Sequence, residues 1–369
     1  MRMNQPKHIR TAADVLVASV EMVGYFPCNS IVLIPYAHRH GRACLRMDLP
    51  ADEAQIPPEE YAAAVMGNLL QLRDADRVLI SVFTDSPIGE RETPFAEHAL
   101  AIAEMAAFAG LRVEALLCRG SNRWRSYVSD EHGGLEALDR ATSGAVKADL
   151  AEFARIPEAD PALERSLRGL LAGEYPPLRQ TEIPVVLDAW ENLLDARSGE
   201  LEGFDQEHRL IAFALVALAF RSARATECLL ANAVYGEAAA EDLQRVWHAL
   251  DAADEPVDGL ISEQIEIEPI RLERAAAGAE LLRTLVGALP PEDAANALAA
   301  LSWLEWARGS STLAGHFAEH SIRLGSAHRL PHRVLELSES GITPGWVRQA
   351  GCSGGFRQED FDRLLEASE

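Results

Sequence analysis

The chain has 369 residues, of which 48% are hydrophobic and 25% charged, an ordinary composition for a folded globular protein. At about 150 residues per domain, this length predicts two domains. The 57 acidic residues outnumber the 34 basic ones and give a net charge of −23, which argues against a nucleic-acid-binding protein and against docking on an anionic membrane.

The first 140 residues alternate between helical and strand patterns. Thr11 and Asp14 form a start similar to a capping box, for a helix that Gly24 ends. In chain order, the patterns predict helix 11–23, strands 30–34 and 42–49 joined by a turn at 38–41, helix 57–73, strand 77–84, helix 93–110, strand 111–118 and its hairpin partner 123–129.

Two strand–helix–strand crossovers, 42–84 and 77–118, predict that strands 42–49, 77–84 and 111–118 are parallel. The turn at 38–41 predicts that the first two strands form a hairpin. We therefore expect residues 8–140 to form an α/β domain with a mixed, largely parallel sheet.

Strand patterns end near residue 145. Helices are predicted over 146–156, 160–172, 181–197, 207–232, 239–252, 270–288, 292–308, 311–324 and 329–340. The segment 263–270 alternates acidic and aliphatic residues and fits either a strand or an extended linker. Gly309 lies at the turn of a helical hairpin that is similar to one tetratricopeptide unit. We expect residues 145–369 to form an all-α domain, with this tetratricopeptide-like hairpin near 292–325.

The five cysteines are isolated and form no CxxC pair: Cys28, Cys44, Cys118, Cys228 and Cys352. Their number and spacing favour neither a disulfide framework nor a zinc ribbon. Asp14 and Glu21 interrupt the first apolar stretch, unlike an export signal. The longest apolar run, 210–220, is shorter than the roughly 20 residues that a membrane-spanning helix needs. These features predict a cytoplasmic protein without a membrane segment.

Several blocks in the first 130 residues occur in the order found in a known family: 10–16, 24–27, 29–33, 45–50, 76–80, 83–85, 116–119 and 123–127. In this order they resemble an actinobacterial family defined by domain of unknown function 4192. The resemblance covers about 8–130 and extends more loosely over the helical half. It implies the fold and no known activity. Members often carry cysteines in the turn after the last hairpin, but the matching stretch here, 128–134, has none, which speaks against a metal or redox role for it.

Polar residues follow the predicted strands at the edge where their carboxyl ends meet, and ligands bind at this edge in open α/β sheets. The hairpin brings the start of strand 30–34 to the same edge. We call these candidates the strand-end rim: Asn29, Ser30, Arg46, Asp48, Thr84, Asp85, Arg119, Trp124 and Tyr127. Together they offer carboxylates, arginine donors for an anion and an aromatic wall.

The same residues also fit structural roles. Asp and Thr after strands often cap turns. Arg46 and Asp48 can form a surface ion pair of little energetic value, and Trp124 can close the core.

Two histidine pairs have a spacing that places both rings on one helix face, as in some metal sites: His316 with His320, and His328 with His332. Neither pair has further ligands at a usable spacing, so we expect no metal site. The sequence contains no GxGxxG, GxxxxGK[ST], GxSxG or HExxH motif, which excludes the easily recognised dinucleotide-binding, NTPase, esterase and zinc-protease classes.

Two functions fit these observations. One is a non-catalytic protein-interaction or scaffold protein that meets a protein partner through its acidic helical domain. The alternative is a small-ligand-binding protein, or an enzyme, that acts on a partly anionic molecule at the strand-end rim. The sequence assigns no catalytic residue and no cofactor.

Overall fold

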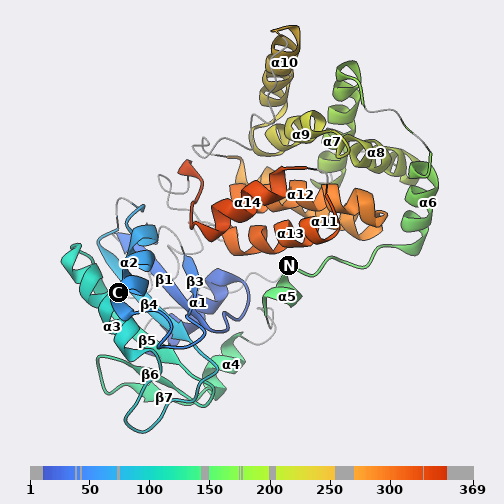
Figure 1. Cartoon of the computed structure of the whole chain (residues 1–369). Helices are drawn as coiled ribbons and strands as arrows, with labels where there is room; N and C mark the ends of the chain where they lie inside the picture. The colour runs from blue at the N-terminus through green and yellow to red at the C-terminus, as the bar shows by residue number, and fades with distance from the viewer. Residues whose placement is uncertain are drawn as a thin grey trace. The chain divides into compact units, whose positions relative to one another are not determined.

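The computed structural model describes residues 11–37, 40–41, 44–72, 75–142, 149–173, 175, 178–198, 205–253, 270–326 and 328–346. They belong to two compact units, one that extends to Phe153 and one that spans Ala154–Trp346. Figure 1 shows the sheet in the first unit and the helices of the second. Residues 38–39 of the predicted turn, residues 263–269 of the undecided segment, and Cys352 lie outside the described residues.

The first unit begins with helix α1 (Ala12–Val23), which has the predicted capping box. The backbone N–H of Asp14 donates to Thr11 Oγ1 at 3.3 Å, and the N–H of Thr11 donates to the Asp14 carboxylate at 2.9 Å. Gly24 ends the helix with a φ of +87°, a conformation that side chains with a Cβ rarely adopt. Local chemistry alone therefore fixes both ends of α1.

The described residues form one sheet of seven strands in the order β2-β1-β4-β5-β6-β7, with β3 also paired to β1. The strands are β1 (Ser30–Ala37), β2 (His40–Gly41), β3 (Leu45–Asp48), β4 (Arg77–Phe83), β5 (Arg112–Arg119), β6 (Trp124–Ser126) and β7 (His132–Gly133). The predicted strand 123–129 is thus shorter than expected, and the sequence patterns missed β7.

The expectation of a largely parallel sheet is wrong. Among the described strands, β4 and β5 form a parallel pair and the other pairings are antiparallel. The crossover from β3 to β4 passes over β1, which lies between these two strands and is antiparallel to both. Because both are antiparallel to β1, β3 and β4 still run in the same direction, and β5 follows them. Their carboxyl ends therefore share one edge of the sheet.

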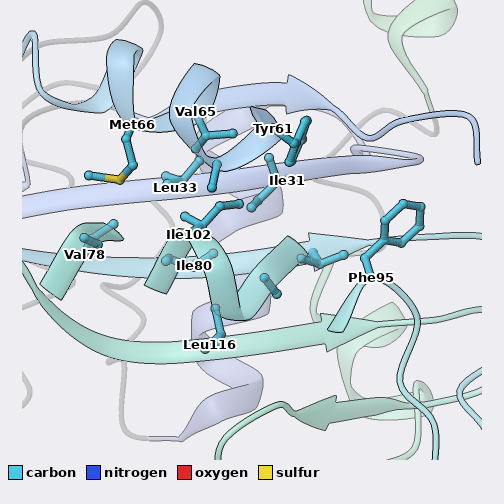
Figure 2. Packing of buried hydrophobic residues seen from close by; sticks show 14 of the residues in the cluster. Ile31, Leu33, Tyr61, Val65, Met66, Val78, Ile80, Phe95, Ile102 and Leu116 are labelled. Carbon is cyan, nitrogen blue, oxygen red and sulfur yellow. The ribbon is translucent and has the colours of Figure 1, made fainter. Parts of the chain in front are cut away.

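Each face of the sheet carries its own apolar core. Helices α2 (Pro58–Leu69) and α3 (Ala96–Phe108) cover one face, where Ile31, Ile80 and Leu116 are fully buried (Figure 2). Helix α1 covers the other face, over Val32 and Phe83. The helices α4 (Glu136–Thr142) and α5 (Leu150–Phe153) complete this unit. The two cores follow from the alternation of side chains along each strand.

The second unit is entirely helical in its described residues. Its helices are α6 (Pro161–Leu171), α7 (Ile183–Ser198), α8 (Gln206–Ala219), α9 (Ala223–Tyr235), α10 (Glu237–Ala253), α11 (Leu272–Ala288), α12 (Pro291–Ala307), α13 (Ser311–Arg323) and α14 (Leu330–Glu339), with a short 3-10 turn at Gln180–Glu182. The predicted helix 207–232 is two helices, because Ser222 adopts an extended conformation and caps α9 through the N–H of Ala225. No helix in the described part of the chain is both long and apolar enough to cross a membrane.

The predicted hairpin at 292–325 is present as α12 and α13, which pack together around Gly309. Helix α12 is buried on every side, because α11, α13 and α14 all pack against it. A buried carboxylate inside this unit is paired: that of Glu305, which is 1% exposed, contacts Arg283 and Arg308. The hairpin therefore forms the centre of the helical core.

Candidate strand-end rim of the sheet

The pairing register places five residues in one row along the edge of the sheet. Asp48 pairs with Ser30, Ser30 with Phe83, Phe83 with Arg119, and Arg119 with Trp124. Directly paired residues on neighbouring strands point to the same face. Phe83 belongs to the core under α1, so the whole row lies on the α1 side of the sheet.

Four candidates at this edge have local hydrogen-bond partners. Asn29, which has a φ of +44°, donates from its side chain to the Asp85 carboxylate at 2.9 Å and accepts from the N–H of Asp85 at 3.1 Å. The hydroxyl of Thr84 accepts from the N–H of Ser86, and the hydroxyl of Ser30 donates to the carbonyl of Cys28. The Asn29–Asp85 bonds fasten the loops before β1 and after β4 to each other, and the other two bonds each lie within one of these loops, which is the structural role that such residues often have.

Arg46 and Asp48 form an ion pair along β3. The Arg46 Nη2 atom lies 2.6 Å from Asp48 Oδ1. The Asp48 side chain is 77% exposed, so water screens the pair and it adds little stability. Three strand spacings of about 4.8 Å separate the backbones of β3 and β5, so Asp48 and Arg119 do not pair directly.

Arg46 and Arg119 are equally buried, and in the described chain each has a buried Nε without a hydrogen-bond acceptor, but the carboxylate contact of Arg119 is the longer of the two. The Arg119 side chain is 15% exposed, its guanidinium lies 4.5 Å from the centre of the Phe26 ring, and Nη2 is 3.7 Å from an oxygen of Asp139. The Nε atom is buried, and within the described chain it has no hydrogen-bond acceptor. A buried donor without a partner costs free energy, so this atom would gain from an acceptor that reached it.

Cys28 lies beside this arginine, and the sequence analysis did not single it out. Its thiol is exposed. Its pKa is raised by partial burial and by the Asp85 carboxylate, whereas the positive charges of Arg119 and Arg46 oppose the shift. The thiol is therefore within electrostatic reach of both arginines. Phe26 and Cys28 lie within three residues before Asn29, and this closeness in the sequence was the signal that could have found them.

The expected aromatic wall of Trp124 and Tyr127 does not exist. Trp124 packs in the core under α1, whereas Tyr127 packs with the core under α2 and α3 and donates its hydroxyl to the carbonyl of Pro94 at 2.6 Å. The two residues are three positions apart in extended backbone, so alternation directs them to opposite faces. Tyr127 therefore does not belong to the row of Arg119.

The histidines occupy different environments. His316 and His320 share helix α13, and burial lowers the pKa of both rings. His328 lies before α14 and contacts the carbonyl of Phe220 at 2.5 Å, so it does not share a helix with His332. The described residues contain no cluster of three or more His, Cys, Asp or Glu side chains that could hold a metal. The expectation of no metal site stays a prediction, which zinc analysis of the purified protein would test.

The fold and the strand-end rim define a two-unit protein, with an α/β unit followed by a helical unit, in which a nearly buried arginine lies at the carboxyl ends of the central strands. A family model described as Domain of unknown function (DUF4192) matches residues 16–345, and the chain belongs to this family. The match includes the helical unit as well as the sheet. No curated protein and no solved structure matches the chain.

Proposed function

We propose that the protein binds a small, partly anionic molecule at the strand-end rim, with Arg119 as the principal contact for the anionic group. The observation that carries this proposal is the buried Nε of Arg119, which lacks an acceptor among the described residues. A carboxylate or phosphate oxygen would satisfy it through a charge-assisted hydrogen bond. Phe26 holds the guanidinium in position before the ligand arrives.

The neighbouring charges restrict the ligand. Asp139 lies 3.7 Å from the guanidinium, and Asp85 acts on the adjacent Cys28 thiol. Carboxylates repel a second anion, so the ligand is proposed to be anionic only at the end that meets Arg119 and Trp124. Its remaining part is polar or cationic and faces Asp85. No catalytic step is assigned to these residues.

A thermal-shift screen of small anions and neutral analogues on the full chain tests the proposal. We expect compounds with one carboxylate group to raise the melting temperature of wild type, and Arg119→Met to abolish the response to these carboxylates. Arg112→Met is the matched control, because Arg112 lies at the opposite end of β5 and is 68% exposed. A carboxylate response that survives in Arg119→Met, or no response from any carboxylate in wild type, would contradict the proposal.

A protein-interaction role of the helical unit is the second candidate. The hairpin at 292–325 offers no apolar groove in its described residues beyond the partly exposed Leu324, since α12 is fully covered. Large apolar side chains are exposed elsewhere in this unit, including Val185 on α7 and Ile211 on α8. We propose α7 and α8 as the surface for a protein partner. Loss of a co-purifying protein in Val185→Ser with Ile211→Ser would support this role, and retention would contradict it.

We also propose that the protein acts in the cytoplasm of an actinobacterium. The chain has 32 arginines and only two lysines, Lys7 and Lys147, a bias typical of GC-rich genomes. Its described cysteines are free thiols, which suits a reducing compartment.

A further inference from the structure

A cavity lies on the face of the sheet opposite to the row that contains Arg119. It has a volume of about 410 Å³ and opens between the segment before α3 and the turn after β6. Its lining is mostly polar: Arg91, Thr93, Ala96, Leu100, Arg125, Ser126, Tyr127, Val128, Ser129 and Asp130. Successive side chains of an extended chain point to opposite faces, so Arg125 and Tyr127 lie on this face of the sheet and Trp124 lies on the other.

Two arginines in this cavity are without a carboxylate partner. Arg91 and Arg125 form no ion pair with any described residue, although acidic residues outnumber basic ones in the chain. Arg125 donates from Nη1 to the carbonyl of Glu90 at 3.1 Å, and its other N–H groups make no further hydrogen bond within the described chain. Two guanidinium groups thus line one cavity with most of their donors unused.

The walls of the cavity are held together before any ligand binds. The hydroxyl of Tyr127 joins the turn after β6 to Pro94, and Arg125 joins β6 to Glu90. Ser126 fixes its own turn by accepting from the N–H groups of Val128 and Ser129. A preformed site avoids much of the entropic cost of ordering its groups on binding.

The donors around the cavity come from several directions. The hydroxyls of Thr93 and Ser129 line it together with the arginines. The first turn of α3, which begins at Ala96, has no side-chain cap and adds the positive end of a helix dipole, which the Glu97 carboxylate in the same turn partly offsets. Such a set exceeds what the two oxygens of a carboxylate can accept and suits the three free oxygens of a phosphate monoester. Asp130 disfavours an anion at its own side of the cavity.

Apolar groups lie next to these donors. Val128 is 66% exposed and Leu100 is 40% exposed, and both line the cavity. We infer that this cavity binds the phosphate group of a small phosphate monoester, with Arg91 and Arg125 on the phosphate and Leu100 and Val128 against its apolar part. This site is independent of the one proposed around Arg119.

Calorimetric titration of the full chain with phenyl phosphate tests the inference, with phenol and benzoate as comparison probes. We expect binding of phenyl phosphate in the range of about 1 mM or tighter, and weaker binding of both comparison probes. Arg91→Gln and Arg125→Gln should each weaken binding about tenfold, the usual effect of losing a charge-assisted hydrogen bond. Arg91 is exposed, so its variant folds even where Arg125→Gln does not.

Two control variants separate this site from other anion contacts. Arg112→Gln removes the same charge from an exposed position and should leave affinity unchanged. Arg119→Met should also bind phenyl phosphate as wild type does. Loss of binding in Arg119→Met, with retention in Arg91→Gln, would overturn the inference and assign the phosphate to the strand-end rim. No binding to wild type at about 10 mM would overturn it as well.

Discussion

Replacing Arg119 with methionine separates a ligand-binding arginine from a structural one. Methionine keeps a long side chain over Phe26 but removes every N–H donor and the positive charge. An arginine that stabilises the fold makes contacts whose loss lowers stability. If the arginine instead serves to bind a ligand, its replacement does not lower the stability of the ligand-free protein.

The structure sets the expected magnitude. The buried Nε without an acceptor costs about 1–3 kcal/mol, and this cost disappears in Arg119→Met. The variant loses the cation–π interaction with the Phe26 ring, worth about 1 kcal/mol. It also loses the 3.7 Å pair with Asp139, which is 57% exposed, so that pair is worth at most about 0.5 kcal/mol. The free energy of unfolding should therefore stay unchanged or rise by about 1 kcal/mol.

Scanning calorimetry of wild type, Arg119→Met and Arg112→Met measures this difference. For a unit of this size, 1 kcal/mol corresponds to a shift of about 3 °C in the melting temperature. We expect Arg119→Met to melt at the wild-type temperature or slightly above it in the absence of ligand. A fall of about 6 °C or more would refute the reasoning, because it would show that Arg119 stabilises the fold by about 2 kcal/mol.

Three further predictions concern the helical unit. Arg221 donates to both oxygens of the buried Asp293 carboxylate, at 2.7 and 2.9 Å. Arg221→Met leaves this charge unpaired and should destabilise the unit by about 3–5 kcal/mol in calorimetry. A loss below about 1 kcal/mol would contradict this. Gly287→Ala should increase proteolysis or hydrogen exchange across 154–160, because a Cβ there would clash with the carbonyl oxygen of Pro157. Unchanged protection would show that the segment adapts. Burial lowers the pKa of His328 below its ordinary 6.5, so the unfolded chain takes up a proton first and stability should fall as the pH drops below about 6.5. Urea titrations at several pH values measure this loss, and an equal loss in His328→Gln would assign it to other groups.

The order of elements follows from sequence patterns. Apolar, β-branched runs predicted β1, β4 and β5, although β1 extends beyond residue 34, and helical periodicity predicted most helices close to their observed bounds. Local capping groups explain why α1 begins after Thr11 and ends at Gly24. The shared direction of β3, β4 and β5 also follows from the two crossovers, because each strand returns to the same edge after a helix.

Two features depended on tertiary structure. The position of β1 between β3 and β4 is set by backbone pairing between segments far apart in the chain, for which hydrophobic periodicity carries no signal. The break between α8 and α9 interrupts a continuous helical pattern at Ser222.

The environment of Arg119 in the candidate site also could not be predicted from sequence patterns. The sequence placed this arginine at the end of a strand, and the register confirms that position. Its burial is decided by Phe26 and Asp139, which are distant in the sequence and reach it only after α1 and α4 have packed on the sheet. The number of hydrogen-bond partners of a charged side chain depends on the groups that surround it in three dimensions. Only the folded chain therefore shows that the Nε of Arg119 has no acceptor among the described residues.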